Sequence, residues 1–380
     1  MAALVLVFIL AAVLTGSVVY SLLVVVAARR WLAVRPPPLT APVPISVLKP
    51  LAGVEEGLEE NLRSFFAQQY PEFEILFAVR DVQDPAVAVV ERLQREFPRV
   101  PVQLLATGEP PCPNAKVFAL ERMTTAARSD LLVMSDSDIR AAPDLLARVA
   151  AEFQDPRLGV STCPYRAVPG PSFWSTLEAV GMNTEFLAGI LVARLVEGMK
   201  FAVGPTIVAR KALIGQIGGF ARLGEYLAED FVLGKWAAAG GFGVALSSCV
   251  VEHRIGAQGF AVNARHRLRW ARSTRRSRPA GYWGQVFTNP LPPALLLVLI
   301  QPTWWPLAAV ACFARVAAAW AVAGRVLRDP LCARRWWLIP MQDVVSFITW
   351  IAGFFGNTIT WRGRRYYLHA DGRFELTSSR

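Results

Sequence analysis

Cysteine is scarce and scattered in this chain of 380 residues, which contains only Cys112, Cys163, Cys249, Cys312 and Cys332. Their odd number and wide spacing indicate neither a disulfide framework nor a cysteine-based metal site. We therefore expect these thiols to face a reducing compartment such as the cytoplasm. The sequence also lacks any nucleic-acid recognition motif, so its net charge of +11 does not predict a nucleic-acid partner.

The basic residues lie beside apolar segments instead, where the positive-inside rule and anionic lipid account for them. Hydrophobic residues make up 54% of the chain and the mean hydropathy is +0.36, which is high for a wholly soluble protein. The first apolar run, Ala2–Ala28, is long enough as a helix of about 40 Å to cross a bilayer. No positive residue precedes it, whereas Arg29, Arg30 and Arg35 follow. We expect a retained anchor that places the following segment in the cytoplasm.

Composition divides the chain into six segments. An N-terminal anchor (1–30) and a proline-rich linker (31–44) precede a soluble α/β domain (45–262). A basic interfacial segment (263–290), a C-terminal membrane region (291–361) and a basic tail (362–380) follow. Pro302 and Pro306 predict that the membrane region begins with a hairpin of one short and one longer helix. Its last apolar stretch, 336–356, either crosses the membrane or re-enters it.

Strands and helices alternate in the first part of the α/β domain. Apolar runs predict strands at 45–48, 73–79, 102–105 and 131–134, and apolar residues at helical spacing predict helices at 55–69, 85–97 and 115–127. This alternation predicts parallel strands with helices on both faces. Beyond it we expect helices at 141–153 and 173–196 and strands at 159–165 and 201–210.

The stretch DLLVMSDSD (130–138) ends in paired carboxylates. Its apolar residues, Leu131–Met134, predict a strand buried on both faces, and open α/β sheets bind ligands beyond the carboxyl ends of such strands. Asp136 and Asp138 follow directly. Two carboxylates at this spacing suit Mg2+ or Mn2+ and leave coordination positions for a substrate phosphate. The alternative is a buried strand followed by a solvated acidic turn.

Other polar residues also have two interpretations each. Asp81 ends the strand at 73–79 and either caps the helix that begins near Pro85 or hydrogen-bonds a nucleotide base or ribose. Lys116, just inside a predicted helix, is either solvated or reaches a phosphate. Glu229 and Asp230 open a helix, where the macrodipole favours acids, or else one of them is a general base at a pocket edge.

The segment 263–278 is rich in arginine. It is either a cationic helix on the membrane surface or a ligand-binding element, and both descriptions can hold together. In the second, Arg269 pairs with a diphosphate through its planar guanidinium, and Trp270 stacks on a sugar or a lipid headgroup.

The order of these motifs is more specific than any one of them. An aspartate after an early strand, a DxD after a later one, an ED pair and an RW before membrane helices resemble the D, D, D, (Q/R)xxRW pattern of processive and lipid-directed GT-A glycosyltransferases. The stretches SVLKPLAGVEEGLEENLRSFFAQQYPEFEILF (46–77) and YLAEDFVLGKW (226–236) resemble glycosyltransferase family 21, the ceramide glucosyltransferases and their bacterial relatives. The resemblance covers most of the chain, from the N-terminal anchor to the WRGRRYY at 361–367.

The resemblance implies a Rossmann-like GT-A domain for nucleotide-diphospho-sugars, flanked by N-terminal and C-terminal transmembrane helices. It implies Asp230 as the catalytic base and Asp81 at the uridine. It places ribose and a metal-bound diphosphate at Asp136 and Asp138. It also places Arg269 and Trp270 at the diphosphate and acceptor.

One departure concerns the acceptor, because His266 stands where the family has glutamine or arginine. The HxxRW form is similar to that of hopanoid-associated N-acetylglucosaminyltransferases.

The lead hypothesis is thus a multi-pass membrane enzyme with its catalytic domain on the cytoplasmic face. It transfers glucose from UDP-glucose to a ceramide-like lipid with inversion of configuration. The first alternative is transfer from UDP-N-acetylglucosamine to a hopanoid polyol. The second, from another class, is a non-catalytic membrane scaffold whose α/β domain binds a nucleotide or a partner. The sequence leaves the sugar, the lipid, the topology of the last membrane segment and the oligomeric state open.

Overall fold

The computed structural model describes residues 1–377, which divide into two compact units. The α/β unit comprises residues 35–165, 199–256 and 372–377, and the helical unit comprises 1–34, 166–198 and 257–371. The six-segment division stays a prediction, and the last three residues of the predicted tail lie outside the described residues.

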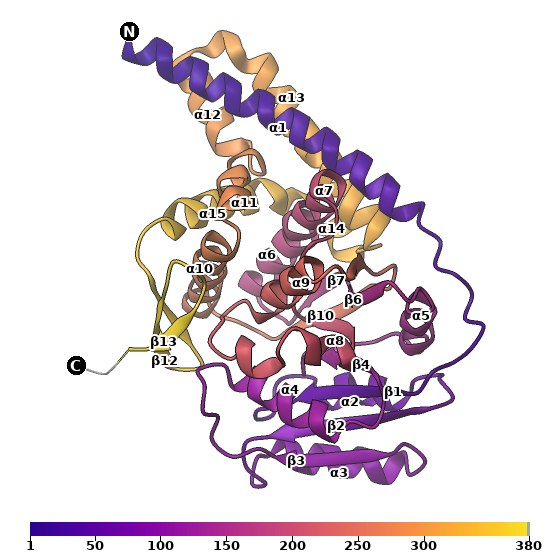
Figure 1. Cartoon of the computed structure of the whole chain (residues 1–380). Helices are drawn as coiled ribbons and strands as arrows, with labels where there is room; N and C mark the ends of the chain where they lie inside the picture. The colour runs from indigo at the N-terminus through magenta and orange to yellow at the C-terminus, as the bar shows by residue number, and fades with distance from the viewer. Residues whose placement is uncertain (378–380) are drawn as a thin grey trace. The chain divides into compact units, whose positions relative to one another are not determined.

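A seven-stranded sheet forms the centre of the α/β unit (Figure 1). Its strand order is β3-β2-β1-β4-β8-β6-β9. The strands are β1 (Ile45–Pro50), β2 (Phe73–Val79), β3 (Val102–Ala106), β4 (Leu131–Ser135), β6 (Leu158–Thr162), β8 (Thr206–Arg210) and β9 (Gly243–Leu246). All five residues of β4 are buried, as the apolar run predicted.

One strand of this sheet runs opposite to its neighbours. β1, β2, β3 and β4 are parallel neighbours, but β8 runs antiparallel to both β4 and β6. The parallel strands expected from the alternation at 45–134 are therefore confirmed, and β8, which lies beyond that alternation, is antiparallel. The chain leaves the α/β unit after Tyr165 and returns at Met199. β8 is thus not the second strand of a βαβ crossover, and the rule that makes such strands parallel does not apply to it.

Helices cover both faces of the sheet, as predicted. They are α2 (Leu58–Phe66), α3 (Ala86–Glu96), α4 (Ala115–Ala126), α5 (Leu145–Glu152), α8 (Lys211–Gln216) and α9 (Glu229–Ala239), with a 3-10 turn at η2 (Phe220–Leu223). Leu120 of α4 and Leu233 of α9 share one core cluster with Leu48 of β1. On the other face, Phe66 of α2 stacks on Phe77 of β2 at 5.9 Å between ring centroids.

Short strands complete this unit. β5 (Ile139–Arg140) follows the predicted acidic turn and pairs antiparallel with β10 (Val251–Ile255). The helix expected at 141–153 therefore begins only at Leu145, after Pro143, whose ring is unsuited to a helix interior. The strand expected at 201–210 is restricted to β8. A last strand, β13, spans Phe374–Leu376.

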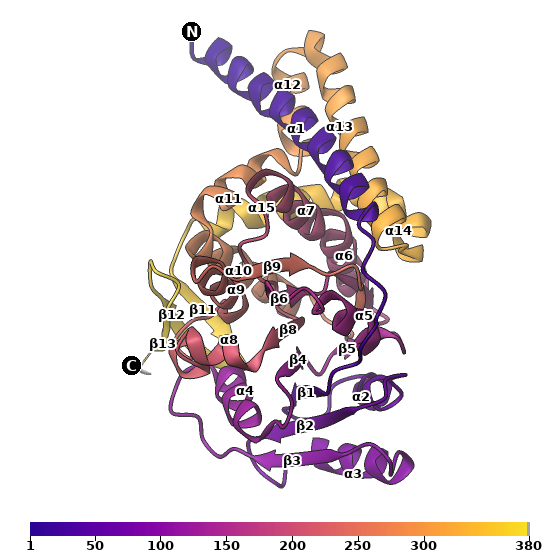
Figure 2. The ribbon, with the colours of Figure 1, turned by 45° about the vertical axis from the view of Figure 1, so that its right-hand side comes forward.

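The helical unit contains the apolar segments. Its elements are α1 (Ala2–Leu32), β7 (Tyr165–Pro169, beginning at the boundary), α6 (Phe173–Gly181), a π-helix η1 (Met182–Phe186), α7 (Leu187–Glu197), α10 (Phe260–Ser277), α11 (Pro279–Gly284), η3 (Gln285–Phe287), α12 (Leu291–Ile300), η4 (Pro302–Trp304), α13 (Trp305–Ala319), a π-helix η5 (Trp320–Val326), α14 (Pro330–Arg335), η6 (Trp336–Leu338), α15 (Ile339–Gly353), β11 (Thr358–Trp361) and β12 (Arg364–Leu368). Helices α1 and α13 run alongside each other in Figures 1 and 2. Leu14 of α1 and Ala311 of α13 belong to the same buried cluster.

Within residues 1–377, three helical stretches are long and apolar enough to cross a membrane: Ala2–Leu32, Phe173–Glu197 and Pro302–Val326. A fourth is possible if the bent pair Pro279–Phe287 and Leu291–Ile300, which meet at 51°, forms one span. The expected hairpin of a short and a longer helix is present as α12 and α13. The stretch 336–356 is not among these candidates, since α15 has 15 residues.

A buried ionic cluster joins three elements of the helical unit. The Arg315 guanidinium of α13 lies 3.1 Å from Asp343 of α15 and 3.4 Å from Glu185 of η1. Ser346 of α15 donates a hydrogen bond of 2.7 Å to Glu185. Each charge therefore has a partner of opposite sign, which is how ionisable groups are retained among apolar helices.

Candidate functional site

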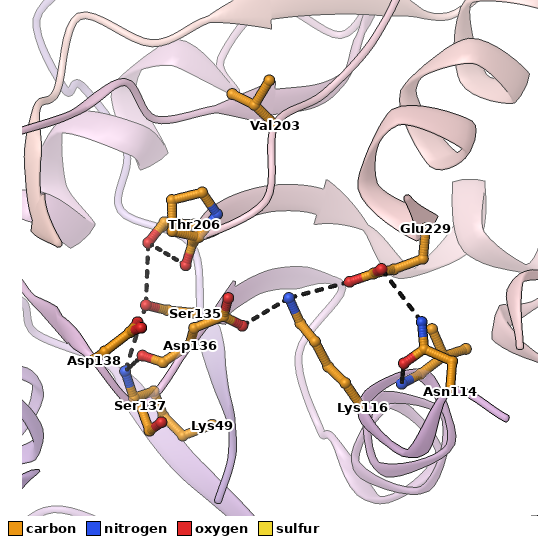
Figure 3. A network of polar contacts seen from close by, with 12 residues as sticks. Lys49, Asn114, Lys116, Ser135, Asp136, Ser137, Asp138, Val203, Thr206 and Glu229 are labelled. Carbon is orange, nitrogen blue, oxygen red and sulfur yellow. Dashed lines mark hydrogen bonds and ion pairs between the residues drawn. The ribbon is translucent and has the colours of Figure 1, made fainter. Parts of the chain in front are cut away.

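The turn after β4 is held in place by hydrogen bonds from two segments, the residues at the start of β8 and Lys49 of β1. The Asp136 N–H donates to the Pro205 carbonyl at 3.0 Å, which ties the turn to the residues before β8. Ser135 and Thr206 share a hydrogen bond of 3.0 Å between their hydroxyls. The Lys49 ammonium of β1 donates to the Asp136 carbonyl (Figure 3). The position of the acidic turn is thus fixed by the sheet itself.

Lys116 links the acidic turn to the start of α9. Its Nζ lies 2.7 Å from Asp136 Oδ1 and 3.2 Å from Glu229 Oε1. Asn114 caps α4 by accepting from the Val117 N–H, and its Nδ2 donates to Glu229 Oε2 at 3.3 Å (Figure 3). Burial opposes the charge on Lys116, but Asp136 and Glu229 outweigh it and raise the pKa of the lysine. Lys116 is therefore a fixed cation beside the turn.

The two aspartates of the turn differ in their surroundings. Burial raises the pKa of Asp136, although Lys116 acts against that shift. Burial also acts on Asp138, but the adjacent His253 outweighs it and lowers the pKa of this carboxyl. His253 Nε2 of β10 lies 3.0 Å from Asp138 Oδ2. Asp138 is therefore held ionised by His253, whereas Asp136 is paired with Lys116.

Asp138 Oδ1 is the atom that fits a metal ion. It is buried and makes no hydrogen bond to any residue from 1 to 377. A buried carboxylate oxygen without a donor is costly unless a cation or a water binds it. Carboxylate oxygens are the ligands that Mg2+ and Mn2+ prefer. The residues present therefore fit a divalent ion at this turn.

Asp230 lies in a pocket of the α/β unit that is also lined by Lys116, Asp136 and Glu229. Burial, and then the neighbouring Glu229, raise the pKa of Asp230 to about 7. A Cβ atom added to Gly204 would lie 2.9 Å from Asp230 Oδ2, so the carboxyl rests against the backbone before β8. A carboxyl with this pKa can accept a proton at neutral pH and release it again.

Lys49 lies beneath the turn with no exposed surface. Burial lowers the pKa of Lys49 to about 7, against the attraction of Asp136 and Asp138. Its Nζ also lies 4.0 Å from the centroid of the Phe65 ring. This lysine thus lies on the interior side of the acidic turn and carries a positive charge below about pH 7.

Asp81 follows β2 and is exposed. Its Oδ1 accepts from the Gln83 N–H at 2.8 Å and so forms a local turn. The N-cap of α3 is Pro85, so Asp81 does not cap this helix, and the Ala86 N–H donates to Asp84 Oδ1 at 2.9 Å. The proposed contact of Asp81 with a nucleotide stays a prediction.

His266, Arg269 and Trp270 lie on α10 of the helical unit. The His266 ring lies 4.8 Å from the Trp270 ring, and Trp270 lies 5.8 Å from Phe186. The Arg269 guanidinium lies 6.0 Å from the centre of the Trp361 ring. Local packing thus groups these three side chains with aromatic rings, and their roles in binding substrate stay predictions.

Sequence reasoning missed two charged residues of the site. Lys49 is the one charged residue in the apolar run ISVLKP, and this contrast is the signal that could have singled it out. His253 lies 115 residues from Asp138 in the sequence, and no motif around it indicates that the two side chains pair. Glu229 was considered only as an alternative base, whereas the structure makes it the second partner of Lys116.

The comparisons with known proteins identify the family of the chain. A family model described as glycosyl transferase family 21 matches residues 6–374. Over 206 residues, the chain is 32% identical to ceramide glucosyltransferase 1 of Caenorhabditis elegans, covering 54% of this chain and 44% of that protein. It is 33% identical over 118 residues to the ceramide glucosyltransferase of Komagataella phaffii, covering 29% and 23%. The chain therefore matches less than half the length of these curated relatives.

One solved structure shares the fold over nearly the whole chain. It is the mannosyltransferase PcManGT from Pyrobaculum calidifontis, in complex with GDP-Man and Mn2+. The TM-score is 0.53 at 20% sequence identity, and the match covers 91% of this chain and 99% of that one. At this identity the likeness establishes the GT-A fold and nothing finer.

Proposed function

The chain belongs to glycosyltransferase family 21, and from that membership we propose that it is a membrane-bound inverting glycosyltransferase acting on a ceramide-like lipid. The proposed reaction transfers glucose from UDP-glucose to a lipid hydroxyl and gives a β-glycosyl lipid. The observation that carries the proposal is the pocket in which Asp230, with a pKa of about 7, lies with Lys116 and Asp136. The curated relatives, described as ceramide glucosyltransferases, support the donor and the acceptor class.

Asp230 serves as the general base in this proposal. It takes the proton of the acceptor hydroxyl while the hydroxyl oxygen forms a bond to the anomeric carbon. The bond from that carbon to the diphosphate oxygen breaks on the opposite face, with UDP leaving, so a single displacement inverts the configuration. Glu229, bound to Lys116 and Asn114, keeps the start of α9 in place beside the base.

The acidic turn and Lys116 stabilise the leaving group. Lys116 places a cation at the edge of the pocket, where it offsets charge on the departing diphosphate. Asp136 and Asp138 would hold Mg2+ or Mn2+, which when bound supplies further positive charge to the diphosphate. The Mn2+ and GDP-Man in the structure of the mannosyltransferase support this assignment. Asp81, at the end of β2, is the proposed contact for the uridine.

The helical unit supplies the acceptor side of the proposal. Arg269 and Trp270 are proposed to bind the diphosphate and the acceptor, with His266 as a further acceptor contact. The candidate spans support an integral membrane protein whose acceptor is a membrane lipid. The arginines that follow the first span, Arg29 and Arg30, support a cytoplasmic location for the α/β unit.

A hopanoid polyol with UDP-N-acetylglucosamine is the second candidate. The observation that favours it is His266, which stands where the family has glutamine or arginine.

A product analysis tests both candidates. Solubilised protein is incubated with UDP-glucose or UDP-N-acetylglucosamine and with ceramide, diacylglycerol or bacteriohopanetetrol, and the lipid products are identified by mass spectrometry. We expect hexosylceramide from UDP-glucose and ceramide. Glycosylation of the hopanoid alone would overturn the lead proposal in favour of the second candidate. No product with any pair would favour the non-catalytic scaffold.

A further inference from the structure

Glu178 is a buried carboxylate inside the apolar helix α6. Its side chain is 4% exposed, and it lies within the candidate span Phe173–Glu197. Ionisable groups within such spans are rare, because each must be stabilised by partners, and they mark functional sites by default. The two partners of Glu178 both come from α10: Asn263 Nδ2 at 2.6 Å and His266 Nδ1 at 2.7 Å. The carboxylate therefore acts on the helix that carries the RW pair.

The side chain of Asn263 is held by a second hydrogen bond, which fixes the orientation of the group that donates to Glu178. The Asn263 Oδ1 accepts from Arg267 Nε at 2.8 Å, and Arg267 also donates to Gln342 Oε1 at 3.1 Å. Gln342 in turn donates to Ser346 at 2.7 Å. This chain of hydrogen bonds runs from α6 through α10 to α15 and leaves each member with a defined orientation.

The contact with Glu178 decides which nitrogen of His266 carries the proton. A carboxylate only accepts hydrogen bonds, so Nδ1 must be the donor. In the neutral ring Nε2 is then an acceptor with a lone pair. His266 makes no other hydrogen bond to a residue of the described chain. The ring is held edge-on to Trp270 at an interplanar angle of 60°, so its orientation is fixed as well.

We propose that Glu178 is a positioning residue that holds His266 with Nε2 ready to accept a hydrogen bond from a hydroxyl of the lipid acceptor. This inference rests on the proposed function and defines its acceptor more narrowly. A guanidinium at position 266 would only donate, whereas the imidazole held by Glu178 accepts. The acceptor recognised here is thus a lipid with a hydroxyl that donates to His266, in addition to any polar group bound elsewhere.

Nitrogen NMR tests the first half of the proposal without any substrate. The chain has three histidines, so a sample labelled with 15N-histidine gives three imidazoles, which single substitutions of His253, His266 and His369 assign. In the neutral ring of the wild type we expect the proton of His266 on Nδ1, and in Glu178→Leu we expect it to move to Nε2. A wild-type His266 with its proton on Nε2 would overturn the proposal.

Acceptor kinetics test the second half. With UDP-glucose and C6-ceramide, Glu178→Leu should raise KM for the lipid at least about fivefold, the loss of roughly one hydrogen bond, with KM for UDP-glucose within about twofold. Glu178→Gln keeps a carbonyl that accepts from Nδ1 and should restore most of the lipid affinity. Equal changes in both KM values, or a change in kcat alone, would show a merely structural role and overturn the proposal.

A control variant at Glu197 and the choice of acceptor separate the role of Glu178 from the proposed function. Glu197→Gln removes the charge of an exposed glutamate that pairs with Arg278 and should leave both KM values unchanged. If the wild type turns over a hopanoid rather than ceramide, the proposed acceptor is wrong, and the same kinetic comparison is made with bacteriohopanetetrol. If it turns over no acceptor, the proposed function fails, and the position of the His266 proton still supports or overturns the role of Glu178.

Discussion

Replacing Asp230 with asparagine should stop sugar transfer and also stabilise the protein at alkaline pH. Burial and the adjacent Glu229 raise the pKa of Asp230 from 3.8 to about 7. Between about pH 4 and pH 7 the folded protein therefore keeps a proton that the unfolded chain releases. Stability from this group is fully present below the unfolded pKa and is lost as the pH rises through 7. Above pH 7 the folded protein carries the ionised carboxylate of Asp230 in a buried position beside Glu229, where the charge is unfavourable.

The size of the effect follows from the pKa shift. About 3 pH units at about 1.4 kcal/mol per unit give an upper bound of about 4 kcal/mol on the free energy of unfolding. Solvent at this half-buried carboxyl reduces that figure. We expect Asp230→Asn to raise the thermal midpoint by several degrees at pH 8, measured by tryptophan fluorescence in detergent. The gain over the wild type should be smaller at pH 5, where the wild-type carboxyl is largely protonated.

The same variant should lose transfer activity although it gains stability. Loss of a general base typically costs about 10²-fold to 10⁴-fold in rate, so transfer from UDP-glucose should fall by that factor. In the wild type, kcat/KM should rise with pH up to about 7 as Asp230 ionises. Asp144→Asn, at an exposed aspartate of the same unit, is the matched control and should change neither property. Transfer within tenfold of the wild type, or a lower thermal midpoint at pH 8, would contradict the assignment of Asp230 as a buried general base.

Two further substitutions test the surroundings of the base. Asp138→Asn should raise the Kd for Mn2+ at least about tenfold by electron paramagnetic resonance, because it removes a metal-binding oxygen; unchanged binding would remove Asp138 from the metal site. We also expect excess EDTA to abolish transfer and added Mn2+ to restore it. Full transfer in excess EDTA would remove the metal from the mechanism. Gly204→Ala should lower kcat about 10²-fold with little change in the Kd for UDP, because its Cβ would lie 2.9 Å from Asp230 Oδ2 and displace the base. An unchanged kcat would contradict the close packing between them.

The parts of the fold that the sequence predicted are those that depend on local pattern. The buried strand before Asp136 is a short apolar run, and the strands β1, β2 and β3 are runs of the same kind, so periodicity alone identifies them. The direction of β8 could not be predicted in this way. It depends on where the chain re-enters the sheet after residues 166–198, which belong to the other unit.

For the site, too, local motifs were predictable from the sequence and tertiary pairings were not. The motif order singled out Asp136, Asp138 and Asp230, and the structure places Asp136 and Asp230 around one pocket. The pairings remained hidden, because His253 and Asp138 are 115 residues apart and Glu178 and His266 are 88 apart. A pairing of this kind is a tertiary contact between single residues, and it leaves no periodic trace in the sequence.

The buried charges of the helical unit impose an order on membrane insertion. Helix α1 has no charged residue before Arg29 and can enter the bilayer as soon as it leaves the ribosome. The stretch Phe173–Glu197 carries Glu185, whose partner Arg315 is synthesised 130 residues later. A charged side chain at the centre of a bilayer costs about 3 kcal/mol on insertion scales. Glu185 in this candidate span therefore lacks its cationic partner until Arg315 has been made, and Asp343 of α15 joins the cluster last. A nascent chain arrested before Arg315 has been made would hold Glu185 without this partner inside the candidate span.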